Sequence, residues 1–340
     1  MPDLPPQFEL RRYRQHNPDL CNVPDADLER HYRSTGEDEG RLGSAIGDRA
    51  TFFALTANAE SILEIGPLAS PSVSGSNVKY FDVIGTDALK EKARANGMDP
   101  RGCPDIDYVS ATGDIGVIDQ TFDVVVSSHA IEHQPDLVAH LAGVAGLLNP
   151  AGRYFLAIPD KRFCFDHFIA ASTIADVLDA FSTARRLHRA ADIIEHLALT
   201  THNDAQRHWN GDHGEPAWRR DDAIVRHALL HAVSNKDRYV DTHAWQFTPR
   251  SFREIVQMLA NLGLSPFRLL RVYPTLRGTF EFYAVLEKTQ DETDLSAYQL
   301  PGNFDASAYL AANPDVAKAG VDPARHYLEF GRREGRRLKV

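Results

Sequence analysis

A cluster of histidine and glutamate residues is the part of this sequence best suited to chemistry. His129, Glu132 and His133 closely follow an apolar segment at 122–127. Imidazole and carboxylate groups together bind zinc or another divalent ion, and a histidine can also remove a proton from a hydroxyl group. We therefore take His129 and His133 as candidate catalytic residues and all three side chains as candidate metal ligands. Inverted zinc proteases share the spacing His-x-x-Glu-His, but they place it within a long helix, whereas here a strand precedes it.

The residues around this cluster predict alternating strands and helices. Five short apolar segments have the length and composition of buried strands, and they lie at 62–65, 78–81, 107–109, 122–127 and 153–158. Residues 137–148 have the apolar spacing of an amphipathic helix. Residues 248–262 begin with a capping threonine and a proline and end before a glycine, which predicts another helix. Two further strands, at 267–273 and 280–287, close the region.

This order predicts the fold class of the central region. Residues 44–290 should form an α/β domain with a Rossmann-like, doubly wound sheet of seven strands, in which the last strand is antiparallel and lies at an edge. Residues 163–247 do not fit the alternation and are rich in helix formers and histidine. We expect them to form an inserted helical lid over the strand ends.

A repeat brackets the chain. The pattern Phe, Tyr, Asn-Pro-Asp, His-Tyr, Gly, Glu-Gly-Arg runs through residues 8–41 and returns in residues 304–336. Each copy predicts two short helices, which gives small helical repeats at 1–43 and 301–340. A unit of this size is too small to be stable alone, so we expect the copies to pack on each other or on the central domain. A clasp that only stabilises the protein and a binding module are equal alternatives.

The overall composition excludes several classes of protein. The net charge of −10 argues against nucleic acid as a partner, because phosphate binding needs a basic surface. The three cysteines form no C-x-x-C pair, which indicates neither disulfides nor a cysteine-bound zinc and fits the reducing cytoplasm. The chain has no long apolar run and no signal-peptide pattern at its start, so we expect no membrane span and no export.

Two residues at strand ends predict a nucleoside site. Gly66 follows the first strand and lets the backbone approach a ligand closely. Asp82 ends the second strand, where a carboxylate can bind both ribose hydroxyls. Ligands of doubly wound sheets bind beyond these strand ends, where the strand order reverses. The alternative is that Asp82 is an ordinary turn residue.

The central region resembles class I S-adenosylmethionine-dependent methyltransferases. The matching motifs are Leu-Glu-Ile-Gly at 63–66, the acid after the second strand, Phe-Asp-Val-Val-Val-Ser-Ser-His-Ala-Ile-Glu-His-Gln-Pro-Asp at 122–136 and Leu-Leu-Asn-Pro-Ala-Gly-Arg at 147–153. More narrowly, it looks like a bacterial subgroup with Glu-Ile-Gly-Pro and Ile-Pro-Asp-Lys-Arg-Phe. The terminal repeats resemble modules attached to glycan-modifying enzymes and glycosyltransferases, which suggests polysaccharide biosynthesis.

The resemblance implies S-adenosylmethionine as the cofactor. Its methionine part would lie near Glu64 and Gly66, its ribose at Asp82 and its adenine near Asp114. The full set of expected cofactor contacts is Glu64, Gly66, Pro67, Asp82, Asp114 and Ser128. This chain departs from the wider family because Gly66 is followed by Pro-Leu-Ala-Ser rather than by further glycines.

The resemblance also bears on the divalent metal ion. Some class I O-methyltransferases, including ubiquinone-pathway and small-RNA 2′-hydroxyl enzymes, carry Glu-x-x-Glu-His here and bind a metal that activates a hydroxyl. His129 replaces their first glutamate, which shifts the preference from magnesium toward transition metals. Metal-free methyltransferases also carry Glu-His after this strand, where it caps the next helix or lines the pocket, and this alternative stays open.

Further candidates lie after the fifth strand and in the lid. Asp160, Lys161 and Arg162 are candidate substrate-binding residues, with a solvated charge run as the alternative. Trp245 is a candidate for stacking on a sugar, although packing in the core is the commoner fate of tryptophan. His243 is expected to face the active site as a general base or an extra ligand. The other lid histidines have no tidy ligand spacing and are expected to be surface or hydrogen-bonded side chains: His196, His202, His208 and His213.

The leading hypothesis is a cytoplasmic methyltransferase that modifies an oxygen of a sugar or a glycan-linked acceptor. The main alternative is a catalytically weak or inactive scaffold with this fold in a polysaccharide-assembly complex. An RNA-directed enzyme is disfavoured by the charge. The terminal repeats suggest a homo-oligomer or contacts with glycan-assembly proteins.

Overall fold

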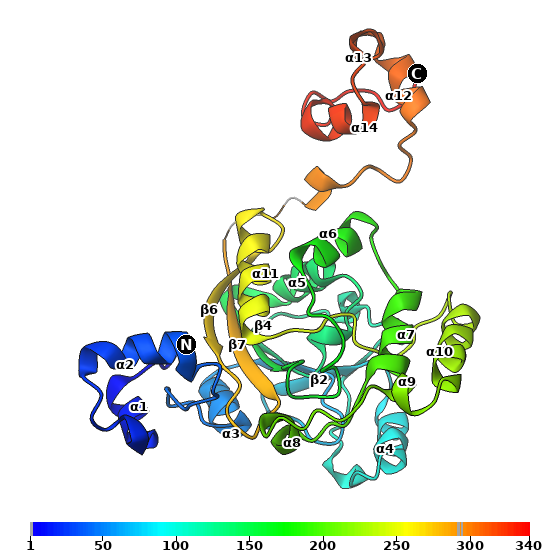
Figure 1. The fold of residues 1–340 in the computed structure, drawn as a ribbon. Helices are drawn as coiled ribbons and strands as arrows, with labels where there is room; N and C mark the ends of the chain where they lie inside the picture. Colours follow the sequence, from blue (N-terminus) through cyan, green and yellow to red (C-terminus); the bar gives the residue numbers. More distant parts are fainter. Residues whose placement is uncertain (1–2, 291–292, 294) are drawn as a thin grey trace. The chain divides into compact units, whose positions relative to one another are not determined.

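The structure is a computed structural model that describes residues 3–290, 293 and 295–340 (Figure 1). The chain divides into two compact units, Met1–Asp291 and Glu292–Val340. The first contains the central domain and the N-terminal repeat, and the second contains the C-terminal repeat. In the described part of the chain, no helix is long and apolar enough to span a membrane.

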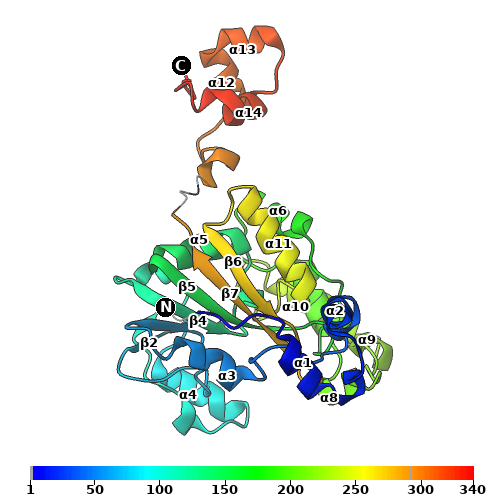
Figure 2. The same ribbon diagram turned by 90° about the vertical axis from the view of Figure 1, so that its left-hand side faces the viewer.

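A seven-stranded sheet with the order β3-β2-β1-β4-β5-β7-β6 forms the centre of the first unit (Figure 2). Its strands are β1 (Ile62–Ile65), β2 (Val78–Asp82), β3 (Tyr108–Val109), β4 (Phe122–Ser128), β5 (Leu148–Pro159), β6 (Phe267–Tyr273) and β7 (Glu281–Lys288). The pairs among β1 to β5 are parallel, and β7 is antiparallel to both of its neighbours. The predicted seven-stranded Rossmann-like α/β fold is therefore confirmed.

The expected position of the antiparallel strand is wrong. The last strand, β7, lies between β5 and β6, and β6 forms the edge of the sheet. The first six residues of β7 are all buried, whereas β6 is partly exposed over its middle residues. A strand that is buried on both faces is more stable inside a sheet than at its edge.

Helices flank the sheet and form the insertion. The α-helices of the first unit are α1 (Leu10–His16), α2 (Asp25–His31), α3 (Arg49–Phe53), α4 (Thr86–Ala95), α5 (Leu137–Gly146), α6 (Ile174–Ser182), α7 (Ala190–Leu199), α8 (Ala205–Trp209), α9 (Ala217–Arg220), α10 (Ala223–Ser234) and α11 (Pro249–Asn261). Single turns of 3₁₀ or π helix are η1 (Pro18–Leu20), η2 (Tyr32–Gly36), η3 (Ala54–Thr56), η4 (Pro100–Gly102), η5 (Ile115–Val117) and η6 (Ile131–His133). The helices α6 to α10 all belong to the stretch between β5 and α11, and α7 packs against α10 (Figure 1).

The helix α11 shows how the sequence fixes an element that supports the sheet. Thr248 caps it by accepting a hydrogen bond from the Ser251 backbone, and the Ser251 side chain returns the bond. Pro249 occupies the first helical position, where no backbone donor is needed. Gly263 follows the helix with φ +68°, which ends it at the predicted residue. The buried face of α11 packs against β6.

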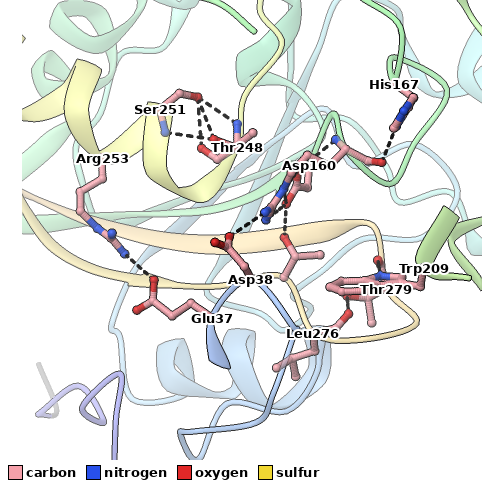
Figure 3. Close-up of polar contacts among 12 residues, drawn as sticks. Glu37, Asp38, Asp160, His167, Trp209, Thr248, Ser251, Arg253, Leu276 and Thr279 are labelled. Atoms are coloured by element: carbon pink, nitrogen blue, oxygen red, sulfur yellow. Dashed lines mark hydrogen bonds and ion pairs between the residues drawn. The ribbon is translucent and has the colours of Figure 1, made fainter. Parts of the chain in front are cut away.

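The N-terminal repeat has a small core of its own around Tyr13 and also contacts the central domain. The Tyr273 hydroxyl of β6 donates to the Pro5 carbonyl at 2.8 Å. Asp38 accepts a hydrogen bond from Arg162 at 2.9 Å, and Glu37 lies 3.9 Å from Arg253 (Figure 3). The N-terminal repeat thus packs on the central domain.

The C-terminal repeat contains α12 (Ala306–Ala312), α13 (Pro314–Ala319) and α14 (Pro323–His326), with η7 (Leu295–Tyr298) before them and η8 (Tyr327–Gly331) after them. It repeats the internal contacts of the N-terminal copy. Tyr309 lies 2.9 Å from His326 Nδ1, as Tyr13 does from His31 Nδ1. A Cβ at Gly331 would lie 2.1 Å from the Tyr309 hydroxyl, so only glycine fits there.

Candidate functional site

The candidate site lies at the carboxyl ends of β1, β2 and β4. The strand order reverses between β1 and β4, since β2 pairs with one side of β1 and β4 with the other. Ligands of doubly wound sheets bind at such a switch point. The structure therefore brings together the turn after Ile65, the end of β2 at Asp82 and the segment that begins at His129.

The turn after β1 keeps a glycine-like backbone at two positions. Gly66 has φ +71°, and a Cβ there would lie 3.7 Å from Ala130 Cβ, which is ordinary van der Waals contact. Leu68 also has a positive φ, of +47°, although this conformation costs an ordinary residue about 1–2 kcal/mol. The turn thus has two residues in the left-handed region, and only one of them is glycine.

Glu64 is fully buried and holds the loop that follows this turn. Its carboxylate accepts hydrogen bonds from the backbone of Ser72 at 2.7 Å and of Val73 at 3.3 Å. Burial raises the pKa of Glu64 to about 7, against the lowering effect of these hydrogen bonds. The side chain therefore fixes the loop at 67–73. Pro67 is buried at the start of the same loop.

The other expected cofactor residues lie at the same edge of the sheet. Asp82 is half-buried and accepts a hydrogen bond from the Ile84 backbone at 3.1 Å, and burial raises its pKa. Asp114 is exposed and caps η5. The Ser128 hydroxyl is buried without a hydrogen-bond partner among the described residues. Asp82 and Asp114 thus keep carboxylate oxygens within reach of a ligand.

A cluster of Glu132, His133 and His243 lies just beyond β4. Their ligand atoms all lie within 4.8 Å of one another. Glu132 is fully buried, and neither of its carboxylate oxygens has a hydrogen-bond partner in the described part of the chain. An unpaired buried carboxylate is costly, so this site favours a cation or a proton beside Glu132. His243 Nε2 lies 3.9 Å from Glu132 Oε1.

Asp166 orients the histidine of this cluster. Its Oδ2 lies 2.5 Å from His243 Nδ1, so Nδ1 carries the proton and Nε2 faces Glu132. Burial lowers the pKa of His243, but the hydrogen bond to Asp166 and the negative charges of Asp166, Glu132 and Asp241 together raise the pKa above its usual value. A carboxylate that holds a histidine in one tautomer is the arrangement of a general base.

Two further features join this cluster to its surroundings. Asp241 lies 3.1 Å from His133 Nδ1 and 3.5 Å from Lys92 of α4, and its pKa is held well below the usual range, chiefly by the hydrogen bond from His133. Burial lowers the pKa of His188 to about 4 and also lowers that of His196. These two histidines are therefore neutral at physiological pH.

His129 belongs to a different group. It has φ +53°, a strained conformation for a bulky residue, and its Nε2 lies 2.7 Å from Glu281 Oε2. Arg49 of α3 forms an ion pair with the same carboxylate. Burial raises the pKa of Glu281, but the bonds from His129 and Arg49 outweigh it and hold the pKa at about 2. The expected ligand set of His129, Glu132 and His133 is therefore not assembled, and His243 takes the place of His129.

The residues after β5 form a structural network (Figure 3). Asp160 is fully buried and accepts hydrogen bonds from Arg162 Nε at 3.0 Å and from Thr275 Oγ1 at 2.7 Å. Arg162 extends the network to Asp38 of the N-terminal repeat. Lys161 donates to the His167 carbonyl at 2.8 Å.

Trp245 is 1% exposed and anchors the end of the insertion. Its Nε1 donates to the Gln134 carbonyl at 2.6 Å, and the Ala244 backbone donates to the Glu132 carbonyl at 2.7 Å. These bonds hold His243 against the turn that carries Glu132. A role of Trp245 in stacking on a substrate remains a prediction.

Sequence reasoning missed Asp166, Glu281 and Arg49. Asp166 and His243 are 77 residues apart in the chain, and His129 and Glu281 are 152 apart. Pairs of this kind depend on how the insertion folds back and on where β7 enters the sheet. No local pattern in the sequence marks them.

One protein-family model matches part of the central domain. Residues 66–156 match a family described as a methyltransferase domain. The matched segment runs from the turn after β1 into β5 and is shorter than half of the chain. A search of curated proteins finds no match to the sequence.

Three solved structures are among those that the chain matches. The CurJ carbon methyltransferase is 11% identical over 83% of this chain and 66% of that chain, with a TM-score of 0.36. An O-methyltransferase family protein from Burkholderia thailandensis is 12% identical over 85% of this chain and 65% of that chain, with a TM-score of 0.31. The O-methyltransferase from Bacillus cereus in complex with SAH is 11% identical over 82% of this chain and 100% of that chain, with a TM-score of 0.31. Similarity at this level does not bear on the acceptor of this chain.

Proposed function

We propose that the protein is an S-adenosylmethionine-dependent methyltransferase that methylates a hydroxyl oxygen, on a sugar or a glycan-linked acceptor. The observation that carries the choice of oxygen is the pair of Asp166 and His243, whose free nitrogen faces a buried carboxylate at the end of β4. The methyl donor would lie over Gly66, with its ribose at Asp82 and its adenine near Asp114.

The residues of the chain suit an in-line transfer. The acceptor oxygen attacks the methyl carbon, the carbon–sulfur bond breaks, and S-adenosylhomocysteine leaves. The hydroxyl proton passes to Nε2 of neutral His243, because the hydrogen bond to Asp166 holds the ring in the tautomer with its proton on Nδ1 and makes Nε2 more basic. Transfer of this kind depends on close positioning of donor and acceptor. The network around Asp160 and the anchor of Trp245 provide the rigid surroundings.

A divalent ion fits the same cluster. Glu132, His133 and His243 offer one carboxylate oxygen and two imidazole nitrogens, the donor set of several zinc and iron sites. The unpartnered oxygens of Glu132 are the structural reason to propose it. A bound ion would supply a positive charge that lowers the pKa of the acceptor hydroxyl. In that case His243 acts as a ligand, as the sequence also suggested.

Calorimetry with S-adenosylhomocysteine tests the cofactor assignment. We expect saturable binding to the wild type and weaker binding to Asp82→Ala, because the variant loses the ribose contact. A folded wild-type sample that releases no heat with this ligand would refute the assignment. Methyl transfer from labelled S-adenosylmethionine to a panel of sugars and oligosaccharides then tests the acceptor class.

One observation favours the second candidate, a scaffold with weak or no catalysis. Leu68 carries a side chain at a position with positive φ, in the loop where the cofactor would lie. In that function the terminal repeats would bind glycan-assembly proteins or a second copy of the chain. Cofactor binding without turnover on any hydroxylated acceptor would support this candidate over the enzyme.

A further inference from the structure

A second cluster of histidines lies in the insertion. His167 follows β5, His208 lies in α8, and His213 lies in the turn after α8. Their ligand atoms all lie within 4.8 Å of one another, and His208 Nδ1 lies 3.0 Å from His213 Nδ1. The sequence spacing gave no sign of this cluster, because His167 comes from a separate part of the insertion.

Two of these histidines are oriented as metal ligands are. His167 donates its Nδ1 proton to the Arg162 carbonyl at 2.8 Å, and His208 donates its Nε2 proton to the His202 carbonyl at 3.1 Å. Each ring therefore directs its unprotonated nitrogen elsewhere, and for His208 that nitrogen faces His213. Metal-binding histidines are typically fixed in this way, by a backbone carbonyl on the other ring nitrogen.

We propose that His167, His208 and His213 bind a zinc ion that joins the segment after β5 to α8. Three neutral imidazoles suit zinc, and the fourth position of its tetrahedron is left for water. Two nitrogens on a tetrahedral zinc lie about 3.4 Å apart at bond lengths of about 2.0–2.1 Å. The 3.0 Å pair is already near that value. The rings of His167 and His213 are stacked with their centroids 3.8 Å apart, so one of these two rings turns out of the stack when the ion binds.

The hydrogen bonds of the cluster agree with this site. The Nδ1 proton of His167 and the Nε2 proton of His208 are both donated to backbone carbonyls, which leaves the other nitrogen of each ring for an ion. Without zinc, His213 Nδ1 donates its proton to His208 Nδ1. When zinc binds, His213 carries its proton on Nε2 instead, so that all three rings stay neutral.

The surroundings indicate a structural role for this zinc. Trp209 stacks on Phe163 with the ring centroids 3.7 Å apart, and it donates to the Thr279 carbonyl (Figure 3). The helix α8 is thus already packed beside the loop that carries His167. Because Asp166 directly precedes His167, a zinc there would also stabilise the residue that orients His243. The zinc site itself does not depend on the proposed methyltransferase activity.

Metal analysis of the full chain without any histidine tag tests the site. Protein stripped with a chelator is titrated with Zn²⁺, and three forms are compared: the wild type, His208→Ala/His213→Ala, and His227→Ala as the control. His227 is an exposed histidine of α10 outside both clusters. We expect the double variant to lose one equivalent of zinc and the control to lose none. Zinc should also raise the melting temperature of the wild type more than that of the double variant.

Two results would overturn the proposal: a wild type that binds no zinc, or a double variant that binds as many equivalents as the wild type. The variant Glu132→Ala separates this site from the other cluster, since it should retain the equivalent that the double variant loses. If the double variant does not fold, anomalous diffraction at the zinc edge from wild-type crystals decides. A peak among the three imidazoles supports the site, and crystals with zinc only elsewhere refute it.

Discussion

Replacing Asp166 by asparagine removes the charge that orients His243 and preserves the volume. The hydrogen bond that changes is short, at 2.5 Å, and both side chains are buried. A hydrogen bond to a charged group contributes about 1.5–3 kcal/mol, and each 1.4 kcal/mol is about tenfold in rate. We therefore expect Asp166→Asn to lower the rate of methyl transfer by about 10- to 100-fold.

The pH dependence identifies the cause of this loss. The bond to Asp166 raises the pKa of His243, so wild-type activity should increase with pH through a value above the usual histidine pKa of about 6.5. Asp166→Asn removes the raising effect of Asp166, although the charges of Glu132 and Asp241 remain. The pKa of His243 should therefore fall, and the increase of activity with pH should move to lower pH. A pH titration of the histidine NMR signals, with no acceptor present, should show the same lowering of the His243 pKa in Asp166→Asn.

The matched control for this variant is Asp136→Asn. Asp136 is also a buried acid, but it caps α5, and asparagine caps helices equally well. The control should keep its rate and its pH profile. If Asp166→Asn keeps the wild-type rate within about twofold, and its activity increases over the same pH range as that of the wild type, then His243 is not a base oriented by Asp166.

Three further predictions follow from the strand ends and the repeats. Gly66→Ala and Gly263→Ala both place a side chain at positive φ without a steric clash, so each should lose about 1 kcal/mol of stability. Only Gly66→Ala should weaken the binding of S-adenosylhomocysteine in calorimetry. Glu281 has a pKa of about 2 against an ordinary 4.5, so its ionised form adds up to about 3 kcal/mol to the free energy of unfolding above pH 4.5. This contribution is lost as the pH falls through about 2. Acid unfolding of Glu281→Gln should therefore show a smaller loss of stability in this range, and a profile equal to that of the wild type would contradict the ion pair. In Gly36→Ala the new Cβ would lie 2.2 Å from the Tyr13 hydroxyl, so the melting temperature should fall by an amount equivalent to about 1–3 kcal/mol, and an unchanged value would show that Tyr13 does not contact Gly36 in solution.

Most of the sheet could be predicted because its strands are short, apolar and separated by turn residues. The helix at Pro249–Asn261 could be predicted to within a residue, because its cap and its final glycine are local signals. The position of β7 could not, since the choice between the edge and the interior depends on which strand the hairpin joins. The burial of both faces of β7 places this strand in the interior of the sheet.

The site was only partly predictable for the same reason. The segment from His129 to His133 pointed to the correct edge of the sheet, and His243 was expected to face it. The division of these residues into two groups was not foreseen. The positive φ of His129 directs its ring to Glu281, and the insertion returns Asp166 and His243 to Glu132. Both depend on contacts between distant parts of the chain.

The central claim is that the edge formed by β1, β2 and β4 binds a methyl donor beside His243. A crystal structure of the wild type grown with S-adenosylhomocysteine tests it most directly. We expect the ribose at Asp82 and the sulfur directed toward the cluster of Glu132, His133 and His243. A ligand bound elsewhere, or a sulfur directed away from His243, would contradict it.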